Sequence, residues 1–444
     1  MAGIGWRLER LIESDSLAGA AAAYATGAAV MALPWLATTA VLAALRPVLG
    51  WANTLLNTAY AVALLVGGPV QIVLSRHAAD RIYERRLTAI AAPFRRGVCA
   101  ALAACGLCTA VALLALGVPA SLAFWGAALS AAVGAQWTAL SVGNGLCSPS
   151  LVLGSVAGGA CGSLALAAGL GVGAGLGVPG CLFGLAAGQC LTLGIVLAGV
   201  MRALPAEADE SEALAPAFRE YAALAVAGLA YNASLWVDKL VVRALAGPEA
   251  AALHSTSSTA AWLAIIPGLA WIFVEVETSF HRRYQAFYSA LKGGSSLAEL
   301  REKAQVLASE GARLLRGATE VQTSVAVLLV IGAERVGQWL GLPPEGIWAF
   351  RLLVIGVSLQ TLTLLGLILL YYFDLRRDAL MAAAGVFFAT AALTAAAIPA
   401  GLPPSAGTAV ASCLGAVFTW RRVDRGIHSV LADTLLCQPF GSEV

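Results

Sequence analysis

The sequence predicts an all-helical membrane protein with about twelve spans in two six-helix lobes. Of its 444 residues, 59% are hydrophobic and only 12% are charged, and the mean hydropathy is +0.82. So few ionisable side chains cannot cover the surface of a water-soluble protein of this size. Apolar runs of about 20 residues, each enough to cross a bilayer as a helix, recur along the whole chain. The chain is therefore predicted to cross a bilayer many times.

The apolar runs predict helices rather than strands. Only helices and closed barrels satisfy every backbone hydrogen bond in lipid, and unbroken runs without strict alternation exclude a barrel. The first six predicted spans cover residues 17–45, 52–75, 97–116, 120–141, 149–170 and 178–201. The second six cover residues 219–246, 256–280, 319–341, 348–373, 379–399 and 404–420.

Polar stretches at the ends and in the middle divide the chain. The N-terminus has the apolar face of an amphipathic helix that lies in the membrane interface, and an acidic run near the middle is typical of a solvated linker. The predicted parts are an interfacial helix at 1–16, an N-terminal lobe at 17–201, a cytoplasmic linker at 202–218, a C-terminal lobe at 219–420 and a cytoplasmic tail at 421–444. The C-terminal lobe includes a cytoplasmic excursion at 281–318, with a helix expected over residues 297–315.

The basic residues predict the orientation of the spans, because short loops rich in Lys and Arg stay on the cytoplasmic side. With the N-terminus inside, 22 of the 27 Lys and Arg residues fall on inward segments, and the exceptions are Arg46, Lys239, Arg243, Arg335 and Arg351. Both termini are therefore predicted to be cytoplasmic. Since topology accounts for the basic residues, the net charge of +2 does not indicate a nucleic-acid partner.

Ionisable residues within the spans are concentrated in the second half. Each costs roughly 2.5–3.5 kcal/mol at mid-bilayer, so it needs a partner, a wet cavity or a function. Between residues 17 and 201 the only carboxylates are Asp80 and Glu84, both in a predicted loop. The transport or ion-pair candidates are therefore Asn232, Trp236, Asp238, Lys239, Arg243, Glu275, Glu277, Glu334 and Arg335. They either line a transport path or form structural ion pairs, and in the second case Asp238 and Lys239 could pair crosswise with Glu334 and Arg335.

Other motifs predict packing rather than chemistry. Gly154, Gly158 and Gly162 recur every four residues in the fifth span, which predicts a close helix contact. Seven of the nine cysteines fall in or beside apolar spans, where they are expected to act as small buried hydrophobes. We expect no metal site, no cofactor and no catalytic constellation, and hence no enzyme.

Five separated blocks of the sequence resemble the PelG family. They are MAGIGWRLERLIESDSLAGA at the start, GGPVQIVLSRHAADRIYERR at 67–86, YNASLWVDKLVV at 231–242, VEVETSFHRRYQAFYSAL at 274–291 and YYFDLRRDAL at 371–380. The resemblance implies a multi-pass protein of the bacterial inner membrane, in the MOP flippase superfamily, that exports the N-acetylgalactosamine-rich Pel exopolysaccharide for biofilm formation. It also implies PelD, PelE and the cytoplasmic glycosyltransferase PelF as partners. In the first span, MALPW at 31–35 departs from the expected Ser-Ser-Gly-Pro-Trp, which weakens any sugar contact there.

Polymer export is the predicted function, and two alternatives stay open. A MATE-type small-molecule or ion antiporter commonly uses an acidic residue in the N-terminal lobe, and the first six predicted spans have none. A non-transporting membrane scaffold of a polysaccharide synthase complex is the second alternative. The excursion at 281–318 is either an inert connector or a docking surface for the synthesis machinery, with Arg282, Arg283, Arg301 and Lys303 as candidate contacts.

Overall fold

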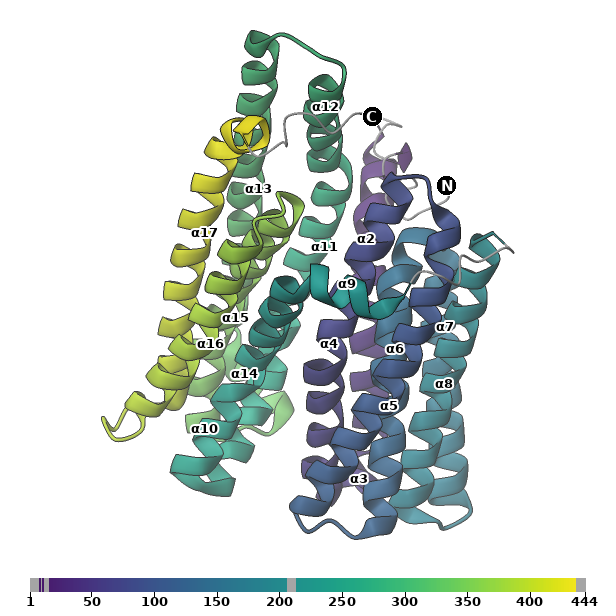
Figure 1. The fold of residues 1–444 in the computed structure, drawn as a ribbon. Helices are drawn as coiled ribbons and strands as arrows, with labels where there is room; N and C mark the ends of the chain where they lie inside the picture. Colours follow the sequence, from purple (N-terminus) through teal and green to yellow (C-terminus); the bar gives the residue numbers. More distant parts are fainter. Residues whose placement is uncertain (1–7, 9, 12–15, 206–212, 437–444) are drawn as a thin grey trace. The chain divides into compact units, whose positions relative to one another are not determined.

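The computed structural model describes residues 8, 10–11, 16–205 and 213–436 (Figure 1). Every regular element within these residues is helical, and nine helical stretches are long and apolar enough to cross a membrane. These stretches overlap ten of the predicted spans, and the other two fall in helices α6 (Ala120–Leu146) and α17 (Pro404–Leu436). The protein is therefore an all-helical, multi-pass membrane protein. The predicted interfacial helix, residues 206–212 of the linker and the last eight residues lie largely or wholly outside the described part.

Contacts divide the chain into two units, which comprise residues 1–11 with 29–232, and residues 12–28 with 233–444. These limits differ from the predicted lobes at two helices. The start of α10 (Ala222–Ala261) packs on α4 (Asn53–Tyr83), where the Asn232 side chain donates to the Leu64 carbonyl at 3.1 Å. The start of α2 (Leu17–Ala44) belongs to the second unit, where the Tyr24 hydroxyl donates to Glu275.

The first unit packs the body of α2 with α3 to α9 around two apolar clusters. The backbones of its fifth and sixth long helices are in contact at Gly159 and Gly188. A Cβ added at Gly188 would lie only 2.4 Å from the Gly159 carbonyl oxygen. The predicted close contact through the glycines at every fourth position of the fifth span was wrong, since Gly154 and Gly158 face open space. Its remaining elements are α3 (Arg46–Leu49), α5 (Ala91–Ala115), α7 (Pro149–Ala167), a π-helical turn (Ala168–Gly173), α8 (Gly177–Ala203) and α9 (Leu214–Glu220).

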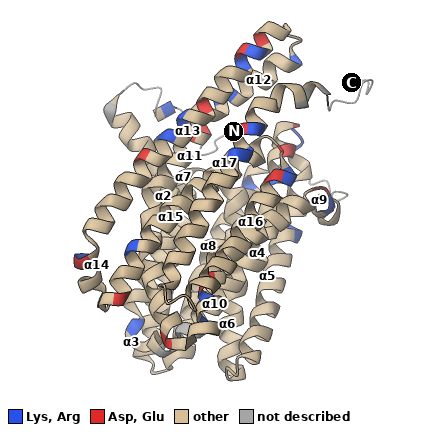
Figure 2. Ribbon diagram, turned by 90° about the vertical axis from the view of Figure 1, so that its left-hand side faces the viewer, with Lys and Arg blue, Asp and Glu red and all other residues tan. Residues whose placement is uncertain are grey.

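The second unit begins with a chain reversal inside α10. Gly247 has φ 88° and ψ 176°, a conformation that glycine adopts without strain, and Pro248 follows it. The unit continues through a 3₁₀ turn (Trp262–Ala264), α11 (Ile265–Glu275), a π-helical turn (Val276–Phe280), α12 (His281–Lys292), α13 (Leu297–Ile331), α14 (Ala333–Leu340), α15 (Pro344–Tyr372), α16 (Arg376–Ala397) and α17. Figure 2 shows charged residues gathered on α12 and the start of α13, and few along the body of α15.

Several helices run past the limits predicted from hydropathy. Helix α4 extends to Tyr83, so Asp80 lies on a helix and not in a loop, and its carboxylate accepts from the Tyr221 hydroxyl at 2.6 Å. Helix α13 begins at Leu297 as predicted but continues to Ile331, which joins the predicted excursion and the ninth span in one rod. Helix α17 continues to Leu436 through most of the predicted tail.

Candidate functional site: two polar pockets and the charges of the second unit

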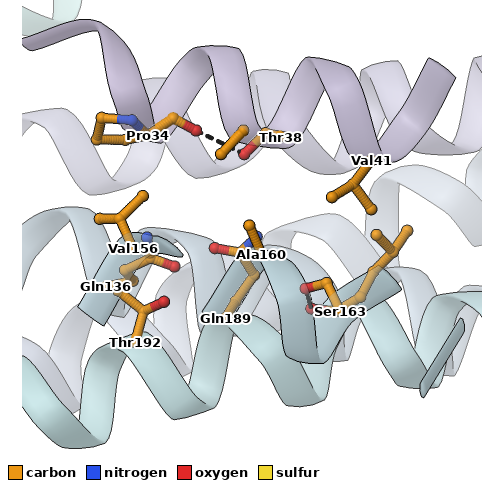
Figure 3. Close-up of a pocket in the computed structure, with 11 residues that line it drawn as sticks. Pro34, Thr38, Val41, Gln136, Val156, Ala160, Ser163, Gln189 and Thr192 are labelled. Atoms are coloured by element: carbon orange, nitrogen blue, oxygen red, sulfur yellow. Dashed lines mark hydrogen bonds between the residues drawn. The ribbon is translucent and has the colours of Figure 1, made fainter. Parts of the chain in front are cut away.

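The first unit encloses a polar pocket without ionisable side chains (Figure 3). About 10 Å³ is open to the centres of water-sized molecules, which is room for roughly one water. The Thr38 hydroxyl donates to the Pro34 carbonyl at 2.8 Å, and the buried Gln136 Oε1 has no hydrogen-bond partner. The lining comes from α2 (Pro34, Ala37, Thr38, Val41), α6 (Gln136), α7 (Val156, Ala160, Ser163) and α8 (Leu185, Gln189, Thr192).

The second unit encloses a pocket of the same size that contains charged residues. Asp238 and Lys239 lie on its wall, and the Gln360 side chain donates to the Ser234 hydroxyl at 3.4 Å. The lining comes from α10 (Ser234, Leu235, Asp238, Lys239, Ser258), the following turn (Trp262), α15 (Leu353, Gly356, Val357, Gln360), α16 (Thr390) and α17 (Thr408, Ser412).

The two pockets occupy corresponding places in the predicted order of spans. The first uses the first, fourth, fifth and sixth predicted spans of its half. The second uses spans at the same four places and also the second span of its half, through Ser258 and Trp262. In both, the fourth span contributes one glutamine, Gln136 or Gln360. Hydropathy alone had suggested two matched sets of six spans, and this correspondence supplies residue-level support for them. Sequence reasoning missed both glutamines because a single amide inside an apolar span has no distinctive spacing.

Asp238, on the wall of the second pocket, is the centre of a buried ionic cluster. Its carboxylate lies 3.2 Å from Lys239 Nζ and 2.9 Å from His254 Nε2. Lys239 Nζ also donates to the Leu235 carbonyl at 2.9 Å and lies 5.8 Å from the centre of the Trp236 ring. The side chains of Asp238 and His254 are each only 4% exposed, so the carboxylate is compensated inside the unit and not by water.

The chain reversal at Gly247 makes this cluster. It turns the second part of α10 back along the first, which brings His254 to a carboxylate sixteen positions earlier. A straight helix would place these two residues about 24 Å apart, at 1.5 Å per residue. Sequence reasoning missed His254 because it treated the region around Pro248 as a connection between spans.

The predicted crosswise pairing of Asp238 and Lys239 with Glu334 and Arg335 was wrong. Helix α13 ends at Ile331, and Glu334 and Arg335 lie on the separate short helix α14, where both are exposed. Glu334 pairs instead with Arg351 of α15 at 3.2 Å. Two further candidates lie apart from the cluster. Asn232 contacts α4 in the first unit, and Arg243 is exposed.

A second ionic network surrounds Glu275 at the end of α11. Arg313 Nη2 of α13 lies 2.5 Å from Glu275 Oε2 and 2.6 Å from Glu310 Oε1. The Ser279 hydroxyl donates to Glu275 Oε2 at 2.9 Å, and the Tyr24 hydroxyl donates to Oε1. The π-helical turn that begins at Val276 directs Ser279 back onto Glu275, and such turns often occur at functional sites. The network therefore joins α2, α11 and α13 within the second unit.

The remaining predicted residues lie near this network along the chain. Glu277 is half-buried on the π-helical turn. Arg282, Arg283 and Arg301 are exposed, and Lys303 forms an exposed pair with Glu299 at 3.7 Å.

Comparisons with known proteins agree with this architecture. The family model PelG, "Putative exopolysaccharide Exporter (EPS-E)", matches residues 1–434. A solved MOP superfamily transporter from Pyrococcus furiosus, whose report describes reversed polarity of its binding pocket, superposes with a TM-score of 0.67 at 13% identity, over 96% of each chain. MATE in a bent conformation gives a TM-score of 0.64 at 14% identity, over 96% of this chain and 98% of that one.

A multidrug resistance MATE family transporter in its outward-facing conformation also gives 0.64, at 13% identity, over 97% of this chain and 96% of that one. No curated protein matches the sequence. At such low identity the solved structures show the fold, which is that of the MOP superfamily, and the family model shows membership. The chain belongs to the PelG family of exopolysaccharide exporters.

Proposed function

We propose that this chain exports Pel polysaccharide, an N-acetylgalactosamine-rich polymer, across the bacterial inner membrane, with both termini in the cytoplasm. The family match over residues 1–434 carries the proposal. A matched polar pocket inside each unit supports it, since a transporter built from repeated helical units needs polar groups away from lipid. The excess of basic residues on the predicted inner segments supports the orientation.

Reconstitution of the chain in vesicles, with and without the Pel synthase, tests the proposal. We expect radiolabelled polymer to become accessible to an external glycosidase only when the exporter and the synthase are both present. Polymer that appears outside without the exporter, or stays inside with it, would contradict the function. A reporter cysteine near residue 300 should react with an impermeant reagent only from the cytoplasmic side.

We further propose that α12 and the start of α13 dock the synthesis machinery, namely PelF with PelD and PelE. A hydrophilic polymer has no affinity for lipid, so capture at its site of synthesis gains the effective concentration that a tether provides. Gly294, with φ 71°, forms the turn between the two helices, and the Ser296 hydroxyl caps the first turn of α13 by accepting from the Glu299 amide at 3.3 Å. The exposed Arg282, Arg283 and Arg301 give this surface a basic character.

Charge reversal tests the docking surface. The double substitution Arg301→Glu and Lys303→Glu should lower co-purification of PelF, PelD and PelE several-fold at ordinary salt, because it replaces two positive charges of the surface. The double substitution Arg421→Glu and Arg425→Glu on α17 is the control of equal charge. Equal recovery of the complex with both variants would make α12 and α13 a connector only.

A further inference from the structure

Helix α13 has a polar face within the stretch that is apolar enough to cross a membrane. This polar face of α13 consists of the exposed Thr319, Glu320, Thr323 and Ser324, and a hollow of about 650 Å³ lies over it. The residues of α13 that pack within the second unit, such as the buried Ala318, lie on the other side of the helix. Within the described part of the chain, no side chain forms an ion pair with Glu320. The described helices of the second unit therefore leave this carboxylate uncompensated.

Two helices show how deep Glu320 lies in the membrane. At a rise of 1.5 Å per residue, Glu320 is about 16 Å from Ile331, where α13 ends. The Gln322 amide donates to the Thr361 hydroxyl at 3.1 Å, and Thr361 is about 16 Å from Tyr372, where α15 ends at the opposite boundary. Glu320 is two residues nearer that boundary, at about 14 Å. Together the two distances match a hydrocarbon core of about 30 Å, so the carboxylate lies near the midplane.

Arg316 lies one turn before Glu320 on the same helix and does not compensate it. Both side chains are exposed, and they form no ion pair with each other in the described structure. An arginine four residues before a glutamate is also the less favourable order on a helix. Arg316 is about 6 Å nearer the boundary, and its long side chain can reach the lipid head groups. The shorter side chain of Glu320 cannot reach that far, so it needs a partner at its own depth.

A groove between α13 and α15 adjoins the polar face of α13. Its volume is about 390 Å³, and it shares Thr319, Thr323 and Val327 with the hollow beside Glu320. Gln322 and Ser358 also line the groove, and their side chains are only 1% and 7% exposed. Among the described residues, Gln322 Oε1 and Ser358 Oγ have no hydrogen-bond partner.

The hydrogen bonds show that this surface offers mainly acceptors. The Thr361 hydroxyl donates to the Val357 carbonyl at 2.9 Å, so it accepts from the Gln322 amide nitrogen and leaves Oε1 free to accept. The Ser324 hydroxyl donates to the Glu320 carbonyl at 2.8 Å and can then only accept from a neighbour. Because a carboxylate also only accepts, whatever covers this surface must supply donors.

Neither a lipid nor a second copy of this chain supplies them. An acyl chain has no hydrogen-bond donor. Two copies related by a twofold axis along the membrane normal would place their Glu320 side chains at the same depth and facing each other. Like charges repel strongly where the dielectric constant is low. The charge of the surface therefore selects a different protein with a cation at mid-bilayer.

We infer that the polar face of α13 binds a membrane-spanning helix of another protein, one with a lysine or arginine near its middle. The basic side chain pairs with Glu320, and the apolar residues of the same helix fill the groove between α13 and α15. Polar pairs of this kind hold membrane helices together because water is not there to replace either partner. The interaction is a property of the membrane surface of the second unit and is independent of export.

A synthetic membrane-spanning peptide tests the pairing in a defined bilayer. The probe is a leucine-rich peptide of about 20 residues with one central lysine, which lies at the same depth in either orientation, and the control peptide has leucine there. A benzophenone amino acid replaces Thr323 in the full chain, reconstituted in lipid nanodiscs. On irradiation, we expect about tenfold more crosslinking to the lysine peptide than to the leucine peptide.

Two variants of α13 test whether the carboxylate is the cause. Glu320→Leu should abolish the preference for the lysine peptide, and it should insert normally because it replaces a charge in a span with an apolar side chain. Glu299→Leu removes a carboxylate from the exposed start of the same helix and should leave the preference unchanged. Equal crosslinking of the two peptides, or a preference that persists in Glu320→Leu, would overturn the inference.

Crosslinking in cells that produce the complete set of Pel proteins tests the class of partner. With the same benzophenone at position 323, mass spectrometry should map the adduct to a membrane-spanning segment of a different protein, close to a lysine or arginine. Adducts only with lipid, with a water-soluble segment or with a second copy of this chain would contradict the inference. Neither experiment measures export, so failure of the proposed function would be seen separately in the vesicle assay.

Discussion

The two units solve the same packing problem with different polar groups. In the first unit the pocket is lined by amides and hydroxyls, and in the second the corresponding pocket is also lined by a carboxylate and an ammonium group, those of Asp238 and Lys239. Both units also pack their last two long helices through glycine, since an added Cβ at Gly407 would lie 2.3 Å from the Leu393 carbonyl oxygen, much as at Gly188.

This difference helps to separate structural features of the two units from functional ones. A feature that both units share, such as the close glycine contact, is explained by packing alone. Charges within the apolar body are costly, and of the two pockets only the second is lined by them. We therefore expect the second pocket to have a task that the first does not perform. Substitutions at corresponding places in the two units can therefore test which features are structural and which are functional.

The largest effect is expected from Asp238→Asn. It leaves Lys239 buried without a carboxylate, and breaking a buried pair in this way costs about 3–5 kcal/mol. Thermal unfolding in detergent would measure the loss, and the double variant Asp238→Asn with Lys239→Gln should recover most of it. If the protein still inserts, export should fall further than for any single polar change in the first six spans. If Asp238→Asn changed neither stability nor secretion, the charged lining of the second pocket would have no role that distinguishes it from the first pocket.

A smaller effect is expected at the glycine contact that both units share. Gly188→Ala forces the α7 and α8 backbones apart, because the new methyl group would lie 2.4 Å from the Gly159 carbonyl oxygen. Overpacking of this kind costs about 1–3 kcal/mol. Gly158→Ala, which faces open space on the same pair of helices, is the matched control and should be neutral or slightly stabilising. Equal melting temperatures for the two variants would refute the assignment of the contact.

The Glu275 network should contribute less than the Asp238 cluster because it is more open. Glu275→Gln removes the charge that holds Arg313, and we expect a loss of about 1–2 kcal/mol, since the Arg313 side chain is 46% exposed and partly screened. Glu299→Gln, which breaks the exposed pair with Lys303, should change the unfolding temperature hardly at all. A Glu275→Gln protein as stable as the Glu299→Gln control would show that the network does not hold α13 to α11.

The smallest effect is expected at the matched glutamines. Gln136→Leu replaces an amide whose Oε1 has no partner, so it should be neutral or stabilise the protein by up to about 0.5 kcal/mol. Gln360→Leu removes the hydrogen bond to Ser234 and should cost about 1 kcal/mol. A loss above about 1 kcal/mol for Gln136→Leu would indicate that this pocket holds an ordered water or another bound group.

Hydropathy located the helices better than it located their ends. It reports residues suited to lipid, whereas a helix continues wherever its backbone can, and α4, α13 and α17 each continue through amphipathic sequence beyond the apolar run. The same limit explains the error at Glu334, which follows an apolar stretch in sequence but lies beyond a helix end at Ile331.

The sequence predicted some members of the two ionic clusters but not their partners. Asp238 and Glu275 could be selected as candidates because a charge inside an apolar span is costly, and this argument does not require knowing which residues lie beside them. Their partners His254 and Arg313 could not be predicted, since the first depends on the reversal at Gly247 and the second on how α13 packs against α11. The prediction of a helix contact at Gly154, Gly158 and Gly162 failed for a related reason. Glycines at every fourth position show that one helix face is smooth, but they do not show that another helix packs against that face.

Helix α13 joins the proposed docking surface and a predicted membrane span of the second unit in one continuous helix. Its 35 residues, at a rise of 1.5 Å each, form a rod about 50 Å long. A tilt of about 5° around the middle of such a rod displaces each end by about 2 Å. Its N-terminal end adjoins the basic surface, and Arg313, roughly at its middle, is held by Glu275. A force applied at Leu297 would therefore tilt α13 about the ion pair between Arg313 and Glu275.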